Sequence, residues 1–203
     1  TMVQTVFGTT TVTSTNSSII TVTTTATTTA TITRTFTVNS IIDESDGPFA
    51  YVAHQQSDDI YIVDLGIGEV VSTFEVGDNP HEVVLHPTRP LLYVAVAGSR
   101  MVSVVDIDTL DTVAIMPTDS YPHGLALTQD GKYLYVTVDN PREVWVFNTE
   151  DNERIAAIDV GTAPHMIIID STDTFAYVTN IVSNTVSVID IVSNIVVDTI
   201  YVD

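Results

Sequence analysis

Three histidines recur at a fixed spacing and are the residues of this chain best suited to chemistry. His81, His123 and His165 stand 42 residues apart, and each directly follows a proline. Imidazole nitrogens bind zinc, copper or nickel, so three of them meeting at one point would form a metal site. A structural interpretation also exists, in which each ring hydrogen-bonds to the backbone of the neighbouring repeat. Recurrence in successive repeats favours that second interpretation, because a constraint of the fold recurs with the fold.

A column of acidic and amide residues shows the same period. Asp64, Asp106, Asn148 and Asp190 are again 42 residues apart. Side chains of this type close turns by accepting hydrogen bonds from the backbone that follows them. Oxygen ligands also suit calcium. No loop here matches an established calcium motif, so the pattern predicts turn capping.

The elements that would position these columns are short β-strands. Tyrosines at 51, 93, 135 and 177 open similar apolar segments, and Val, Ile, Thr and Tyr dominate throughout. Such residues favour pleated strands, which predicts an all-β protein. Four apolar segments recur in each 42-residue period, as in a β-propeller blade. The predicted blades cover residues of about 38–79, 80–121, 122–163 and 164–203.

In this frame the three histidines open the innermost strands of three blades. The predicted first strands are 39–43, 81–85, 123–127 and 165–169. Asn39 takes the histidine's place in the first blade. The chain is expected to close as a four-bladed ring, to combine with a second chain, or to be part of a longer array.

The repeat resembles a known family. Tyr177-Val178-Thr179-Asn180, the Pro-His pairs and the turn Asp130-Gly131 are similar to the YVTN-type β-propeller repeat. That family includes surface-layer and other exported proteins, so the resemblance implies a propeller in an extracellular setting. It implies no reaction, because propellers host many functions. No catalytic motif is visible, and the chain is expected not to be an enzyme.

Residues 1–37 differ from the rest. Between residues 9 and 37 nearly every odd position is threonine, and many even positions are apolar, which predicts a long β-strand extension with two faces. The best turn lies at residues 14–18 and would divide the extension into two strands. The positions expected to contact a neighbouring subunit are Val22, Ala26, Ala30, Ile32, Phe36 and Val38. Asn16 fits a glycosylation acceptor.

Charge and composition exclude several classes of partner. The net charge is −20, and the six basic residues form no cluster, so nucleic acid is not an expected partner. There is no cysteine, and no apolar run is long enough to span a bilayer. The absence of an initial methionine also fits a processed, exported chain or a trimmed one.

Three hypotheses follow. The first is a structural subunit of an extracellular filament, pilus-like fibre or surface layer, whose N-terminal strand pairs with other copies of the same chain. The second is a monomeric propeller that binds a glycan or another surface protein and is carried on a threonine-rich stalk. The third is a metal-binding propeller that uses the histidines. No cofactor other than a divalent metal is expected.

Overall fold

The chain folds into β-sheets. The computed structural model describes residues 8–14, 19–26, 36–39 and 49–202. All regular elements in these ranges are strands, and none of the described residues forms a helix that could cross a membrane. The chain divides into two compact units, residues 1–52 with 61–73 and residues 53–60 with 74–203.

The N-terminal region forms a three-stranded sheet in the order β1-β2-β3. Its strands are β1 (Gly8–Ser14), β2 (Ile19–Ala26) and β3 (Phe36–Asn39). The predicted division near residues 14–18 is confirmed, because β1 and β2 pair antiparallel with Val12 opposite Val22. A single extended strand is not found. A third strand was not predicted, and it places Phe36 opposite Val22 and Val38 opposite Ile20.

The start of the first predicted blade is wrong. Asn39 ends β3 and pairs with Ile19, so it belongs to the N-terminal sheet and does not open a blade. The next sheet has three described strands in the order β4-β5-β6. They are β4 (Phe49–His54), β5 (Asp59–Asp64) and β6 (Glu69–Glu75). Residues 40–43, the remainder of the predicted first strand, lie outside the described residues, as do Asn16, Ala30 and Ile32.

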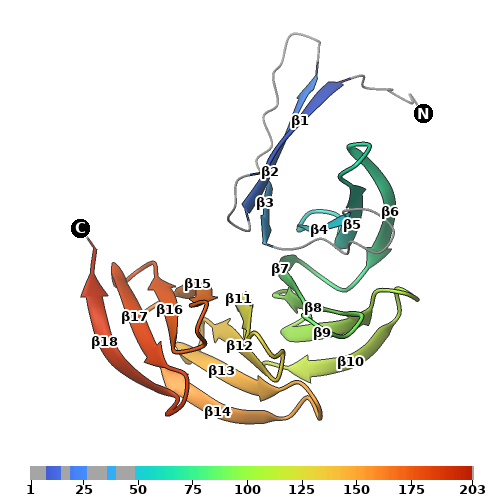
Figure 1. The fold of residues 1–203 in the computed structure, drawn as a ribbon. Helices are drawn as coiled ribbons and strands as arrows, with labels where there is room; N and C mark the ends of the chain where they lie inside the picture. The colour runs from blue at the N-terminus through green and yellow to red at the C-terminus, as the bar shows by residue number, and fades with distance from the viewer. Residues whose placement is uncertain (1–7, 15–18, 27–35, 40–48, 203) are drawn as a thin grey trace. The chain divides into compact units, whose positions relative to one another are not determined.

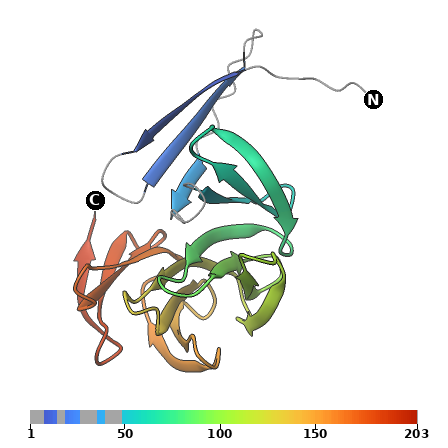
Figure 2. The same ribbon diagram turned by 45° about the vertical axis from the view of Figure 1, so that its right-hand side comes forward.

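Three four-stranded antiparallel sheets follow, as the repeat predicts, and we call them blades 2, 3 and 4. Blade 2 contains β7 (Pro80–Leu85), β8 (Leu91–Val96), β9 (Met101–Asp106) and β10 (Thr112–Pro117). Blade 3 contains β11 (Pro122–Leu127), β12 (Tyr133–Val138), β13 (Glu143–Asn148) and β14 (Arg154–Asp159). Blade 4 contains β15 (Pro164–Ile169), β16 (Phe175–Asn180), β17 (Thr185–Asp190) and β18 (Ile195–Tyr201). In each blade the strands lie in chain order, with β7, β11 and β15 innermost (Figures 1 and 2).

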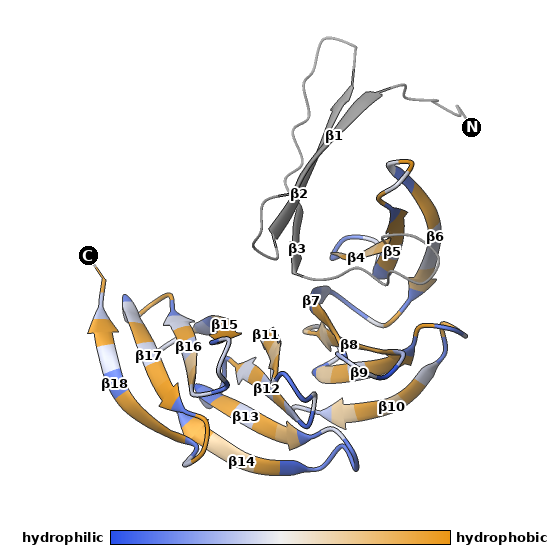
Figure 3. Cartoon of the chain, in the orientation of Figure 1, coloured by the Kyte–Doolittle hydropathy of each residue, from blue (hydrophilic) through white to orange (hydrophobic). Residues whose placement is uncertain are grey.

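The core lies between consecutive blades. Tyr93 of blade 2 is fully buried in a cluster with Leu125, Val136 and Trp145 of blade 3. Tyr135 of blade 3 is buried in the same way among apolar residues of blade 4. Figure 3 shows the hydrophobic residues running along these strands. Tyr93 and Tyr135 thus pack between adjacent blades.

The acidic column closes turns. Asp106 Oδ1 accepts hydrogen bonds from the backbone N–H groups of Asp108 and Thr109, at 2.9 and 3.1 Å. Asp64 and Asp190 accept equivalent backbone bonds in their own repeats. These bonds hold the β-turn between the third and fourth strands, which agrees with the predicted capping.

Replacing Asp106 with alanine should therefore lower the free energy of unfolding by about 1 kcal/mol, because two backbone donors lose their acceptor. Chemical denaturation measures the change. The control is Asp108→Ala in the same turn, where an exposed side chain is removed and the expected change is under about 0.5 kcal/mol. A calcium-dependent rise in melting temperature that Asp106→Ala abolishes would instead indicate a calcium site.

Candidate functional site

Each of the three histidines is positioned by the same local structure. His81, His123 and His165 are the second residues of β7, β11 and β15. The proline before each one is buried. Pairing with the next strand shifts register directly after that proline in all three blades, so no histidine has a partner across the strand. Bulges of this kind redirect a side chain out of the sheet.

The result is a cluster of three rings. One ligand nitrogen from each histidine lies within 4.8 Å of those from the other two, and all three residues are half-buried. The Nδ1 atoms of His81 and His123 are 3.5 Å apart. Ring centroids are separated by 4.7 Å for His81 and His123, and by 5.1 Å for His123 and His165. The structure thus brings together all three histidines singled out by the sequence.

The cluster disfavours protonation. Burial, with the neighbouring rings of His123 and His165, lowers the pKa of His81 from 6.5 to about 4. Burial and the ring of His165 also lower the pKa of His123, although the nearby Asp139 opposes this shift. Close imidazoles resist charging because each new positive charge would repel the next. At neutral pH His81 and His123 therefore carry free lone pairs.

Hydrogen bonding to neighbouring backbone, the structural alternative, is not seen. Within the described part of the chain, none of the three rings bonds to a backbone group of another blade. Besides the long contact between His81 and His123, the hydrogen bond of the cluster among the described residues is with Gln55, whose Nε2 lies 3.3 Å from His81 Nδ1. Asn39, expected in the fourth place, is an N-terminal sheet residue.

Close approach of two inner strands helps to set the spacing of the rings. A Cβ added at Gly124 would collide with the backbone carbonyl of His165. The hydroxyl of Thr137 accepts from Gly124 N–H and donates to that same carbonyl, both at 2.7 Å. Thr137 is fully buried, so this hydrogen-bonded link holds β11 beside β15. Gly124 and Thr137 were not singled out from the sequence. The sequence feature that could have indicated this close approach is the glycine directly after His123, because the other blades have Glu82 and Met166 at that position.

His86, a histidine outside the 42-residue column, is buried. Its Nδ1 accepts from the backbone N–H groups of Thr88 and Arg89, at 3.2 and 3.0 Å. Arg89 in turn donates to the hydroxyl of Tyr93 and to the carbonyl of Thr149 in blade 3. His86 therefore belongs to a structural contact between blades and is not available as a surface ligand.

Comparison with known proteins identifies the family. Residues 74–195, more than half of the chain, match the family described as lactonase, 7-bladed beta-propeller. This chain belongs to that family. A search of curated proteins gives no match. The resemblance to YVTN repeats remains a resemblance, while membership of a propeller family is shown.

Among solved structures, the chain is similar to Kuenenia stuttgartiensis hydrazine synthase, with a TM-score of 0.70 and 25% sequence identity. The similarity covers 75% of this chain and 45% of that one, so the present sequence spans less than half of the solved chain. Both comparisons support the propeller fold.

The metal-free protein should lose stability in acid. Because the pKa of His81 is lowered from 6.5 to about 4, the unfolded chain binds more protons than the native one between these values. The free energy of unfolding should therefore fall as the pH is lowered from about 6.5 to about 4. Denaturant unfolding in the presence of a chelator measures this dependence.

The variant His81→Gln should show a shallower decline over the same pH range, since one of the depressed groups has been removed. His54→Gln is the matched control, because His54 is outside the cluster. If the free energy of unfolding falls with pH equally steeply in His81→Gln and in the native chain, the lowered pKa of His81 is contradicted.

Proposed function

We propose that this chain is a non-catalytic structural subunit of an extracellular assembly, in which the N-terminal sheet of one copy covers blade 4 of the next. The proposal is carried by one observation. Among the described residues of its own compact unit, no strand covers the surface of blade 4 that corresponds to the one blades 2 and 3 use to pack against the blade that follows them.

This surface can be compared in blades 3 and 4 through equivalent rows of residues. In blade 3, Ala126, Tyr135 and Val146 lie side by side across three strands and are 7%, 1% and 0% exposed. The corresponding row in blade 4 is Ile168, Tyr177 and Val188. Ile168 is 62% exposed and Tyr177 is half-buried, whereas Val188 is only 8% exposed. Covering an isoleucine side chain contributes about 1.5–3 kcal/mol, so this face favours association.

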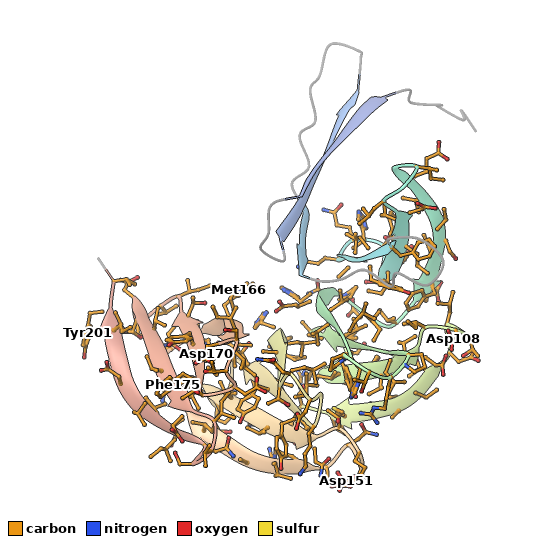
Figure 4. The ribbon with its side chains drawn as sticks, in the orientation of Figure 1. Asp108, Asp151, Met166, Asp170, Phe175 and Tyr201 are labelled. Carbon is orange, nitrogen blue, oxygen red and sulfur yellow. The ribbon has the colours of Figure 1, made fainter. Side chains whose placement is uncertain are left out.

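A hydrogen bond is also missing from this face. Thr137 of blade 3 binds Gly124 N–H and the carbonyl of His165 in the next blade. Its counterpart Thr179 is exposed and accepts from Met166 N–H at 3.0 Å, while its own hydroxyl reaches only the carbonyl of Met166, at 3.4 Å. Figure 4 labels Met166 at the inner side of this blade, opposite Tyr201 on β18. The hydroxyl of Thr179 therefore donates only a long hydrogen bond within its own blade, where Thr137 donates to the next blade.

The N-terminal sheet supplies a suitable partner. Its register places Val12, Val22 and Phe36 in one row and Ile20 beside Val38. Within the described residues, β1 and β3 each pair only with β2, so each has an open edge. Such edges add strands from other chains readily. A contact between two different surfaces of successive copies produces a fibre or a layer when the rotation between the copies does not close into a ring.

An extracellular location fits the composition. The chain combines a net charge of −20 with a threonine-rich leader and no cysteine. The word lactonase belongs to the family's description, and hydrazine synthase is the name of the solved relative. Neither activity is assigned to this chain, which spans less than half of the solved relative.

Self-association can be tested with single substitutions at the two proposed surfaces. Ile168→Asp and Val22→Asp should each reduce assembly at least tenfold, because either change places a charge in the apolar contact. Sedimentation velocity and negative-stain microscopy measure the assembly. Ile155→Asp is the matched control, since Ile155 is a 51% exposed isoleucine on the outer strand of blade 3.

A native chain that stays monomeric at all concentrations would reject the assembly proposal. It would favour the second candidate, a monomeric propeller that binds a glycan or surface protein and is carried on a threonine-rich stalk. Limited proteolysis separates the two, because an assembled leader resists cleavage and a free stalk does not.

A further inference from the structure

The histidine cluster has a chemical capacity that assembly does not use. Three blades contribute one imidazole each, by the same buried proline and the same register shift. We propose that His81, His123 and His165 together bind one late first-row transition-metal ion, of the class of zinc, copper or nickel. This proposal is independent of whether the chain assembles.

The distances fit such an ion. Zinc–nitrogen bonds of about 2.0–2.1 Å place two tetrahedral nitrogen ligands about 3.4 Å apart. The Nδ1 atoms of His81 and His123 are 3.5 Å apart, which is the separation of two ligands on one metal. The widest separation of ligand atoms in the cluster is within 4.8 Å. Bringing the most distant nitrogens to the separation of two ligands on one metal needs a side-chain movement of about 1 Å. A rotation about χ1 or χ2 covers that distance easily.

The existing contacts satisfy the rings only in part, since the one further hydrogen bond of the cluster among the described residues joins Gln55 Nε2 to His81 Nδ1 at 3.3 Å. At 3.5 Å, the contact between the Nδ1 atoms of His81 and His123 is at the limit of a hydrogen bond, and it requires one of them to carry the proton. A half-buried polar atom without a good partner costs free energy. A metal ion that accepts the lone pairs of both nitrogens would remove this cost.

The ligand set selects the class of metal. Calcium and magnesium require oxygen ligands, and the cluster offers nitrogen only. Three imidazoles leave a fourth position for water. Gln55 is positioned to orient such a water, because its amide lies 3.3 Å from His81 Nδ1 and carries both a donor and an acceptor.

The backbone around the cluster is held in place before any metal arrives. Proline fixes the backbone angle φ just before each histidine. Gly124 and Thr137 hold β11 against β15, so the backbones of His123 and His165 cannot move apart without breaking one of the two 2.7 Å hydrogen bonds that pass through the Thr137 hydroxyl. Pre-positioned ligands lose little freedom on binding, which increases affinity.

The experiment uses the full chain after removal of metal with a chelator. Zinc is titrated by calorimetry in excess calcium, which occupies nonspecific sites on the 26 acidic residues. The expected result is one zinc ion per chain and a higher melting temperature. Cobalt serves as a spectroscopic probe, and its visible bands should report tetrahedral nitrogen coordination.

Single variants identify the ligands. His81→Gln, His123→Gln and His165→Gln should each weaken zinc binding at least about tenfold, since losing even an outer-shell partner typically costs 10–100-fold. His54→Gln should bind zinc as the native chain does. Gly124→Ala should also weaken binding, because its methyl group pushes His165 away from His123. Circular dichroism of each variant shows whether it is folded.

Two results would overturn the proposal. One is the absence of stoichiometric zinc and cobalt binding by the folded native chain. The other is binding that survives in all three cluster variants, which would place the metal elsewhere on the chain. A copper titration followed by electron paramagnetic resonance gives an independent count of the nitrogen ligands.

Discussion

The packing of one blade on the next is the constraint on which the rest of this structure depends. Each tyrosine of the 42-residue period is too large to be covered by its own sheet, so it requires the apolar residues of the following blade. Tyr93 and Tyr135 are buried in this way. A blade therefore has no complete core of its own, and its stability is shared with its neighbours. Blade 4, whose Ile168 remains largely exposed, shows what is left when no described blade follows.

The same constraint converts a repeated residue into a cluster. One histidine after a proline has no special chemistry. Packing three blades side by side brings their inner strands together, and the register shift after each proline turns the rings out of the sheets. Three ligands of one type then meet at one place, although they are 42 residues apart in the chain. Sites at the centre of repeat architectures arise in this way because equivalent positions converge on the axis.

The N-terminal sheet and the blades differ in how their surfaces are covered. The main surfaces of blade 3 are covered by blades 2 and 4. The leader forms a three-stranded sheet in the order β1-β2-β3. The proposed assembly assigns this sheet to the exposed face of blade 4 in another copy. The family is described as seven-bladed, and this chain spans 45% of the solved relative, so the blades described here are fewer than the family's full set.

The sequence by itself determined the strand content, the period and the residues of each column. Alternation and β-branched composition act locally, and a period of 42 residues fixes which positions are equivalent, so blades 2 to 4 and the turn-capping acids were predictable. The sequence could not show that Asn39 pairs with Ile19, because a threonine-rich strand fits either sheet equally well. Nor could it reveal the burial of His86, whose partners are supplied by a turn and by the adjacent blade. Whether the three histidines face the backbone or each other was likewise decided only by tertiary structure, since the distance between their rings depends on how closely Gly124 lets two blades approach.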